Sequence, residues 1–348
     1  MKIAIVTDAW KPQVNGVVQT LGKTRDELGR LGHDVLLLTP AGRRTIPCPT
    51  YPEIRLSVMP GRAVARELRE FDPDAIHIAT EAPLGIAARR YCVSHGRDFT
   101  TSYHTQFPEY LRERAPVPVA ATARVLRWFH GRAVRTMVPT AGIREKLLSR
   151  GHPEDQVVVW TRGVDTVLFR PDNAFQYGLD EPVFIYLGRV AVEKNIEAFL
   201  ELDLPGSKVV IGDGPDREKL EAKYRDAHFA GYRFGEELAR MLAGGDVFVF
   251  PSRTDTYGLV MLEAMACGLP VAAFPVEGPI DVVRQGETGV LHEDLAEACR
   301  AALDIDPGRC IAFARERSWR AATLEFERYL APRTRETASA QPASNALR

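Results

Sequence analysis

Hydrophobic and polar positions follow two alternating patterns along the first half of the chain. The opening run KIAIVTD is almost continuously aliphatic and ends on polar residues, which is typical of a parallel strand buried on both faces. A helical pattern follows from residue 17, stops at Gly32, and leads into a second aliphatic run, VLLL. Later apolar runs, DAIHIAT, RDFTTSYHT and TMVPTA, also end on polar residues. This alternation of strand and helix predicts a doubly wound parallel sheet.

The same alternation restarts near residue 183. Four apolar runs, PVFIYLGR, KVVIGDGP, DVFVFPS and GLPVAAFPV, each lead into glycine, proline or charged residues. Between the two halves, residues 163–173 contain the proline and polar residues that are typical of a linker. We therefore expect two Rossmann-like domains, residues 1–168 and 169–330, that face each other across a cleft. Ligands of such sheets bind beyond the carboxyl ends of the strands.

The end of the chain has a pattern of its own. A helical spacing over about residues 315–330 predicts a final helix, which we expect to return to the N-terminal domain. Residues 331–348 are rich in alanine, serine and proline, so they predict a disordered tail.

Composition fits an ordinary globular protein but reveals a charge asymmetry. Of the 45 basic and 46 acidic residues, 25 and 17 lie in residues 1–170, which leaves 20 and 29 in the rest. A basic first half suits an anionic surface, and a membrane is expected rather than nucleic acid. The five cysteines form no CxxC pair, which favours a reducing cytosol. No apolar run approaches the roughly 18 residues of a membrane span.

Two cations follow the first strand of the second half. Arg189 and Lys194 lie in GRVAVEKN, directly after the apolar run that ends at Gly188. A forked guanidinium and a compact ammonium at the carboxyl end of a sheet suit a diphosphate. Gly212, in GDGP after the next strand, would allow close backbone approach. Because GDGP is not the GxGxxG fingerprint, a dehydrogenase is disfavoured.

Two carboxylates bracket the stretch DTYGLVMLE. On one continuous helix, Asp255 and Glu263 would be about 12 Å apart along the axis, too far to share a ligand atom. If Asp255 lies on a loop and Glu263 on the helix that follows, both can face one ligand. The backbone N–H groups of Thr256, Tyr257, Gly258, Leu259 and Val260 would then point at its phosphates.

These motifs together resemble glycosyltransferase family 4, the retaining, nucleotide-sugar-dependent enzymes of the GT-B fold. The family's Glu-x7-Glu signature aligns with Asp255 to Glu263, and its Arg…Lys pair aligns with Arg189 and Lys194. The resemblance implies that Glu263 holds the ribose of the donor and that Asp255 holds hydroxyls of the donor sugar. The first acid is Asp rather than Glu, as in a branch that resembles mannosyltransferases and glycolipid synthases.

The resemblance also assigns residues in the first half. PQVNGVV looks like the family's glycine loop, so Gly16 would close on the diphosphate opposite Arg189. His104, at a strand end, would contact the donor sugar near the reacting carbon. We further expect Asp8 and Tyr103 to face the acceptor.

The expected mechanism needs neither cofactor nor metal. Cations and helix N–H groups would stabilise the charge that develops on the leaving nucleoside diphosphate, with His104, Arg189, Lys194 and Asp255 as the catalytic set. The metal-binding triplet DxD occurs twice, at residues 72–74 and 304–306. The first is expected to be a turn before a strand, and the second a helix end. Two other hypotheses stay open, a nucleotide-sugar epimerase of the same fold and a nucleic-acid-binding module on the basic half.

A helical wheel over residues 120–137 suggests the acceptor. Arg124, Arg127, Arg132 and Arg135 fall within an arc of about 140°, and Trp128 lies among them. Arginines with an interleaved tryptophan suit an anionic membrane interface. We therefore expect a cytoplasmic enzyme on the inner face of the membrane that moves a hexosyl or hexuronosyl group from a UDP-linked donor to a lipid such as diacylglycerol. A GDP-mannose-dependent mannosyltransferase acting on a lipid or saccharide is the alternative.

Overall fold

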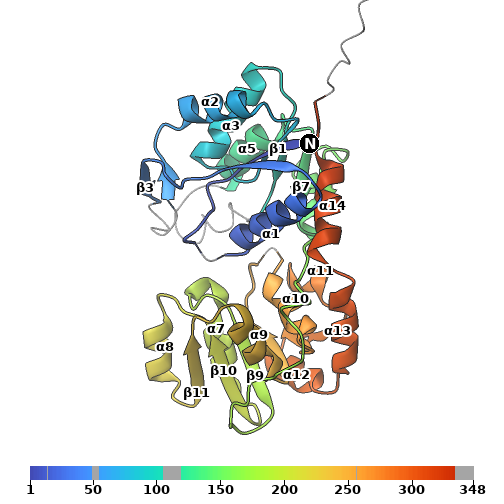
Figure 1. The fold of residues 1–348 in the computed structure, drawn as a ribbon. Helices are drawn as coiled ribbons and strands as arrows, with labels where there is room; N and C mark the ends of the chain where they lie inside the picture. The colour runs from blue at the N-terminus through green and yellow to red at the C-terminus, as the bar shows by residue number, and fades with distance from the viewer. Residues whose placement is uncertain (14, 49–54, 105–118, 256, 334–348) are drawn as a thin grey trace, which may run out of the picture.

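The computed structural model describes the chain in five stretches, residues 1–13, 15–48, 55–104, 119–255 and 257–333. Within them, two six-stranded sheets form two units that are stacked one above the other in Figure 1. Within the described residues, every pair of neighbouring strands in the two sheets is parallel. The predicted pair of parallel α/β sheets is therefore confirmed. The predicted tail falls mostly on residues 334–348, which lie outside the described residues.

The N-terminal unit has the strand order β2-β1-β5-β6-β7-β8. These strands are β1 (Lys2–Val6), β2 (Asp34–Leu38), β5 (Ala75–Ile78), β6 (Thr100–Ser102), β7 (Arg135–Val138) and β8 (Val157–Val159). The helices between them are α1 (Gly16–Arg30), α2 (Gly61–Phe71), α3 (Pro83–Ser94), α5 (Val119–His130) and α6 (Ala141–Ser149). A small antiparallel pair, β3 (Thr45–Pro47) and β4 (Arg55–Ser57), lies outside the main sheet.

The C-terminal unit has the order β11-β10-β9-β12-β13-β14. Its strands are β9 (Val183–Leu187), β10 (Ser207–Ile211), β11 (Ala227–Gly231), β12 (Val247–Phe250), β13 (Val271–Ala273) and β14 (Gly289–Leu291). A 3-10 turn η1 (Val192–Lys194) leads into α7 (Ile196–Leu200). The further helices are α8 (Arg217–Lys223), α9 (Gly235–Ala243), α10 (Leu259–Ala266), α11 (Pro279–Val282), α12 (Leu295–Ala302), α13 (Pro307–Arg315) and α14 (Trp319–Tyr329).

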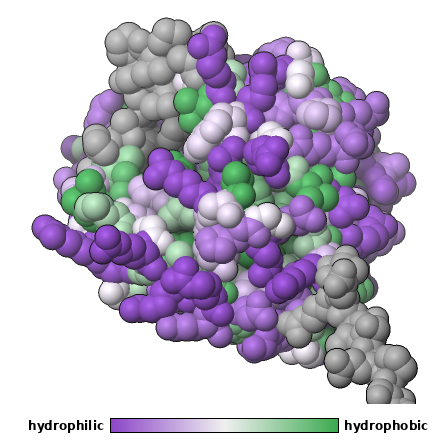
Figure 2. Space-filling view, turned by 90° about the horizontal axis from the view of Figure 1, so that it is seen from above, coloured by the Kyte–Doolittle hydropathy of each residue, from purple (hydrophilic) through white to green (hydrophobic). Residues whose placement is uncertain are grey.

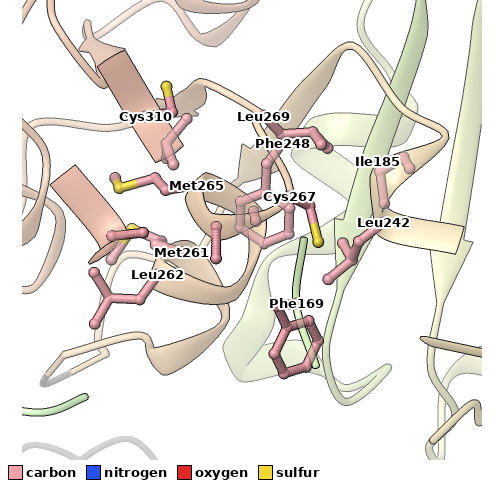
Figure 3. Packing of buried hydrophobic residues seen from close by; sticks show 14 of the residues in the cluster. Phe169, Ile185, Leu242, Phe248, Met261, Leu262, Met265, Cys267, Leu269 and Cys310 are labelled. Carbon is pink, nitrogen blue, oxygen red and sulfur yellow. The ribbon is translucent and has the colours of Figure 1, made fainter. Parts of the chain in front are cut away.

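The core of the C-terminal unit anchors α10. Met261, Leu262 and Met265 of this helix are fully buried against Phe248 of β12 and Cys310 of α13 (Figure 3). Burying a large apolar side chain contributes about 1.5–3 kcal/mol, so these contacts hold α10 firmly in place. The N-terminus of α10 is therefore a rigid part of any site built on it.

The chain crosses between the two units twice, at adjacent places. Val164 pairs with Ser318 in an isolated bridge, and a Cβ on Gly163 would lie 2.4 Å from the backbone nitrogen of Trp319. After the second crossing, α14 packs on the N-terminal unit beside α1 (Figure 1). There Phe326 is fully buried with Trp160, whose indole Nε1 donates to the Ala322 carbonyl at 2.9 Å.

The helix predicted over residues 120–137 is wrong at its C-terminal end. α5 ends at His130, and residue 135 already belongs to β7. The Gln156 side chain donates to the carbonyls of His130 and Ala133 at 2.8 and 2.7 Å, which satisfies the backbone where the helix stops. Arg135 donates to the Tyr329 carbonyl of α14 at 3.2 Å. Arg132 and Arg135 therefore do not share a helix face with Arg124 and Arg127.

Candidate active site

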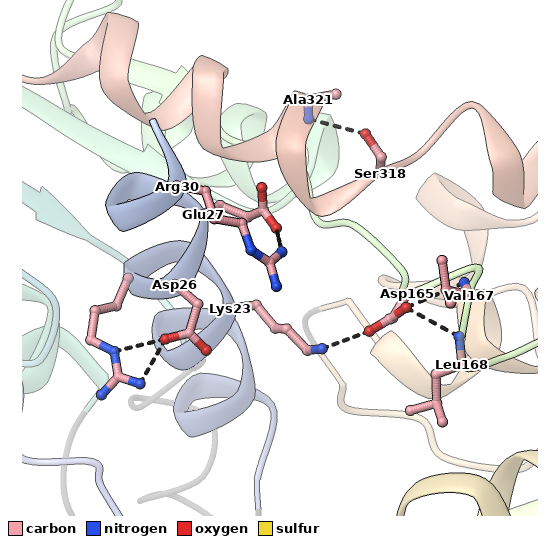
Figure 4. A network of polar contacts seen from close by, with 10 residues as sticks. Lys23, Asp26, Glu27, Arg30, Asp165, Val167, Leu168, Ser318 and Ala321 are labelled. Atoms are coloured by element: carbon pink, nitrogen blue, oxygen red, sulfur yellow. Dashed lines mark hydrogen bonds and ion pairs between the residues drawn. The ribbon is translucent and has the colours of Figure 1, made fainter. Parts of the chain in front are cut away.

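The starts of α1 and α10 face each other across the two units. A Cβ added at Gly16, the first residue of α1, would lie 3.4 Å from the Leu259 Cδ1 atom of α10. One turn further along each helix, Gln19 Nε2 donates to Glu263 Oε1 at 2.6 Å. Figure 4 shows a second link, from Lys23 of α1 to Asp165 of the crossing segment at 2.8 Å. Two helix N-termini, each with the positive end of its dipole, therefore meet at one place.

The start of α1 is held by a side-chain cap. Asn15 has extended backbone geometry, and its Oδ1 accepts from the backbone N–H groups of Val17 and Val18 at 3.1 and 3.0 Å. This is the usual N-cap arrangement, in which a side-chain oxygen satisfies the first free donors of the helix. The predicted glycine loop thus ends in a well-defined helix start at Gly16.

The predicted diphosphate lysine and the predicted sugar-binding acid are in direct contact. Lys194 Nζ lies 2.6 and 2.8 Å from the two carboxylate oxygens of Asp255. Asn195, in the left-handed conformation after η1, donates to the Pro251 carbonyl at 3.0 Å and ties this turn to the end of β12. Arg189 lies on the same edge, with its Nη1 3.8 Å from Glu193 Oε1. The structure therefore brings Arg189, Lys194 and Asp255 together at the carboxyl end of the second sheet.

Glu263 is buried on α10 and accepts the hydrogen bond from Gln19. Burial raises the pKa of its carboxyl group, and the Gln19 bond acts in the opposite direction. Because Gln19 belongs to the other unit, the carboxylate joins the two units at this point. The sequence pattern missed Gln19, since nothing in its local sequence distinguishes it from a surface glutamine.

Glycine is needed at several positions of the site, for different structural reasons. Gly258 adopts φ 77° as the N-cap of α10, and a Cβ there would lie 2.7 Å from Met261 Cε. A Cβ on Gly212 would lie 1.9 Å from the Gly188 carbonyl oxygen. Gly188 and Gly212 are therefore required where the ends of β9 and β10 pack together. Leu259 and Val260 form the first turn of α10, and Thr256 lies outside the described residues.

His104 lies at the end of β6, next to the crossing segment. Its Nδ1 is 3.4 Å from Arg162 Nη2, and its ring packs edge-on against Trp160 at a centroid distance of 6.1 Å. Burial, then the charge of Arg162 and then His77, hold the pKa of His104 well below its usual value. His104 is therefore neutral at physiological pH.

Asp8 lies at the end of β1, and its contact with an acceptor stays a prediction. Its side chain is buried and accepts from the backbone N–H groups of Leu84 and Gly85 at 3.0 and 3.3 Å, at the start of α3. Burial raises the pKa of Asp8 to about 6, although these hydrogen bonds act against the shift. Tyr103 is also buried, in a cluster with Leu126 of α5 and Val138 of β7.

The DxD triplets occupy structural positions where the structure describes them. Asp72 is the left-handed C-cap of α2, and Asp74 accepts from the backbone N–H of Lys2 at 2.8 Å. Asp306 caps the start of α13 through the N–H of Gly308 at 2.9 Å. The carboxylates of Asp74 and Asp306 therefore serve the ends of secondary-structure elements, and that of Asp72 lies 3.8 Å from Arg97 Nη1. Independence from metal stays a prediction.

Sequence profiles of known families match both halves of the chain. The profile described as Glycosyltransferase Family 4 matches residues 14–168, and the one described as Glycosyl transferases group 1 matches residues 181–305. The GDP-mannose-dependent alpha-mannosyltransferase of Mycobacterium tuberculosis is 33% identical over 319 residues, which cover 84% of this chain and 83% of that protein. The chain belongs to glycosyltransferase family 4.

Other relatives of this family 4 glycosyltransferase differ in their named products. The sulfoquinovosyl transferase of Arabidopsis thaliana is 34% identical over 82% of this chain and 62% of its own length. The alpha-monoglucosyldiacylglycerol synthase of Acholeplasma laidlawii is 26% identical over 88% of both chains. The suspected family is confirmed, and its relatives include both the mannosyltransferases and the glycolipid synthases of the suspected branch. The prediction that the chain is a glycosyltransferase is confirmed as well.

A solved structure supports the fold of this family 4 glycosyltransferase. Sucrose-phosphate synthase from Thermosynechococcus elongatus superposes with a TM-score of 0.73 at 22% identity, over 94% of this chain and 97% of that one. The two facing sheets are therefore the GT-B fold. Ligands of open parallel sheets bind at strand carboxyl ends, which is where Arg189, Lys194 and Asp255 lie.

Proposed function

We propose that this enzyme transfers a hexosyl group, with retention of configuration, from a nucleotide sugar to a lipid acceptor. The main support is the meeting of two helix starts with a lysine–carboxylate pair at the edge of the second sheet. A Cβ on Gly16 would lie 3.4 Å from Leu259 Cδ1, and Lys194 binds Asp255 in the loop that precedes α10. Preorganised hydrogen-bond donors and cations stabilise a developing negative charge without having to move during the reaction. A leaving diphosphate carries such a charge.

The proposed reaction exchanges one bond at the anomeric carbon for another. The bond from this carbon to the diphosphate oxygen breaks, and the acceptor oxygen bonds to the carbon on the same face. The acceptor proton passes to the leaving phosphate. Arg189 and Lys194 would neutralise the diphosphate, and neutral His104 would donate a hydrogen bond to the sugar. The hydrogen bond from Gln19 to Glu263 would break, and the Glu263 carboxylate would bind the ribose instead.

The names of the relatives bear most directly on the identity of the nucleotide-sugar donor. The mycobacterial relative is named for GDP-mannose, which favours the GDP-linked alternative over the UDP-linked donor first expected from the sequence. Asp255 is the residue proposed to meet the sugar hydroxyls, so Asp255→Glu tests sugar choice directly. We expect a changed ratio of kcat/KM between GDP-mannose and UDP-glucose. An unchanged ratio would show that Asp255 does not contact the sugar.

A lipid acceptor is supported by the named product of one relative and by the exposed surface of α5. The Acholeplasma relative is a diacylglycerol glycolipid synthase by name. On α5, Trp128 is 47% exposed and Val125 58% exposed, with Arg124 and Arg127 on exposed positions nearby. Among the described residues, no helix combines the length and apolar character that crossing a membrane would require.

A product assay tests the proposed function. The enzyme is incubated with isotope-labelled GDP-mannose or UDP-glucose, with and without vesicles that contain dioleoylglycerol. We expect label in the lipid phase with one donor, and NMR of the product should show the same anomeric configuration as the donor. Label that changes its sugar identity without acceptor would instead indicate the epimerase. An inverted product, or no turnover of any nucleotide sugar, would contradict the proposal.

A further inference from the structure

Arg162 is a buried arginine at the crossing between the two units. It is 4% exposed, and its guanidinium donates to the Trp160 and Thr161 carbonyls at 2.6 and 3.2 Å. The same group lies 4.3 Å from the centre of the Trp160 ring. Nothing in the sequence motif around it, TRGVD, indicated a role in the site.

The burial of this cation lacks the usual compensation. Within the described parts of the chain, Arg162 forms no ion pair with a carboxylate. The acid that acts on it from α14, Glu325, binds instead the backbone N–H and hydroxyl of Thr161, both at 2.8 Å. A buried charge without an ionic partner costs several kcal/mol, and burial lowers the pKa of Arg162 to about 10. The two carbonyls and the Trp160 ring account for only part of the guanidinium, whose Nη2 group faces His104.

Arg162 determines which nitrogen of His104 carries the proton. Its Nη2 group faces His104 Nδ1 at 3.4 Å, and a guanidinium can only donate. Nδ1 must therefore act as the acceptor, and the proton of the neutral ring is on Nε2. Among the described residues, His77 of β5 also acts on this ring, and it is itself neutral because burial lowers its pKa to about 3.

Tyr257, in the loop before α10, directly precedes Gly258, the N-cap of that helix. Burial raises the pKa of the Tyr257 hydroxyl, while the charge of Arg162 and then that of Arg317 act in the opposite direction.

We propose that Arg162 is a positioning residue that keeps His104 in its Nε2-protonated tautomer. The inference rests on the proposed function, because it assumes that His104 donates a hydrogen bond to the transferred sugar. Arg162 would then act through His104, without touching the substrate.

NMR of the imidazole nitrogens tests the tautomer without any substrate. In protein labelled with ¹⁵N-histidine, the His104 signals are assigned from their loss in His104→Gln. We expect the wild type to show protonated Nε2, with no titration between about pH 5.5 and 8. Arg162→Met should show mixed tautomers or titration in this range. Arg162→Lys, which keeps the charge, should stay closer to the wild type. Identical His104 spectra in the wild type and a folded Arg162→Met variant would overturn the inference.

Kinetics of the same variants test the action of Arg162 through His104. With GDP-mannose or UDP-glucose, whichever is turned over, Arg162→Met should lower kcat about tenfold or more, with KM changed less than about threefold. The acid limb of the kcat profile should move to higher pH in Arg162→Met and move less in Arg162→Lys. In the His104→Gln background, Arg162→Met should produce no such movement.

The two proposals fail in different ways. A wild-type enzyme that turns over no nucleotide sugar rejects the proposed function, while the NMR result still decides the tautomer. An active wild type with the same pH profile in Arg162→Met rejects the role of Arg162 alone.

Discussion

At the scale of single residues, Lys194, Asp255 and Glu263 are each bound to another side chain of the site. Lys194 binds Asp255, and Glu263 accepts from Gln19 of the other unit. A sugar nucleotide offers phosphate oxygens to Lys194 and hydroxyls to both acids, so binding would exchange these contacts for equivalent ones. Each of the three ionisable groups therefore keeps a partner of suitable chemistry in both states.

Substitution of Lys194 should separate catalysis from stability. Lys194→Ala removes the cation proposed to stabilise the leaving diphosphate, so we expect kcat/KM to fall by about 10²–10³. Because the pair is partly exposed, the free energy of unfolding should change by no more than about 1 kcal/mol. The matched control is Lys223→Ala, which removes an exposed pair with Glu197 in the same unit and should leave kcat/KM unchanged. Full activity of Lys194→Ala would show that the diphosphate lies elsewhere.

Asp8 should make stability depend on pH in a direction unusual for a carboxylate. Its pKa of about 6 in the folded state is above the ordinary 3.8, so the folded state binds the proton more tightly. The stabilisation is complete below pH 3.8 and is lost as pH rises through about 6.

Urea unfolding of Asp8→Asn measures this effect. Relative to the variant, the wild type should lose about 1 kcal/mol of unfolding free energy between about pH 5 and 7.5. Asp26→Asn, on the exposed part of α1, is the matched control. Equal pH dependence of wild type and Asp8→Asn would show that the carboxyl is already ionised throughout this range.

The sequence revealed those site residues whose position follows from strand order. Arg189, Lys194 and Asp255 were predicted together because each follows an apolar strand, and the carboxyl ends of parallel strands share one edge. Arg162 and Gln19 were not predicted, because their importance comes from contacts with residues far away in the chain. The contact of the Asp8 carboxylate with the start of α3 was not predicted either, because it joins residues 76 positions apart in the chain.

At the scale of elements, α14 is the structural link between the units. The helix follows the second crossing and packs on the N-terminal unit, although it belongs to the last part of the chain. Its N-cap, Ser318, accepts from the backbone N–H of Ala321 at 3.1 Å. Loosening α14 should therefore destabilise the first unit rather than the second.

Truncation of Phe326 tests this dependence. The side chain is fully buried with Trp160, so Phe326→Ala should cost about 3–5 kcal/mol of unfolding free energy. Leu324→Ala, at a position that is 46% exposed on the same helix, should cost less than about 1 kcal/mol. Hydrogen exchange should show this loss of stability as faster exchange of the backbone amides in β1 and α1. Exchange that accelerates only in the C-terminal unit would contradict the assigned packing.

Element prediction from sequence succeeded where an apolar run marks the strand and failed where none does. Strand β9 has the sequence VFIYL, with five apolar residues, and β10 ends in three, VVI. β11 has the sequence AHFAG and β14 has only three residues, so neither carries a periodic signal. The helix drawn through residue 137 failed because a helical wheel cannot show that residues 135–138 complete a sheet.

At the scale of the whole molecule, the membrane-contact hypothesis now rests on α5. Figure 2 views the molecule from above, with its hydrophilic side chains interrupted by separate apolar areas. Trp128 packs under the guanidinium of Arg89 at 3.9 Å, which fixes the indole at the surface. Any membrane contact is expected to combine this indole with Arg124 and Arg127.

Flotation with vesicles tests the membrane surface. Each surface arginine near anionic lipid contributes about 1 kcal/mol, so Arg124→Gln with Arg127→Gln should weaken binding about 30-fold. A double control, Arg225→Gln with Arg309→Gln, changes the net charge equally at exposed positions of the C-terminal unit. Binding should also fall with salt. Wild-type protein that floats with neither anionic nor neutral vesicles would refute the membrane surface.

The central claim is that a diphosphate binds between the two units, and a crystal structure with GDP or UDP tests it most directly. We expect the diphosphate within hydrogen-bond distance of Arg189, Lys194 and the N–H groups at the start of α10, with Gly16 opposite. Glu263 should then contact the ribose in place of Gln19. A nucleotide bound at any other surface, with the Lys194–Asp255 and Gln19–Glu263 contacts unchanged, would contradict the account.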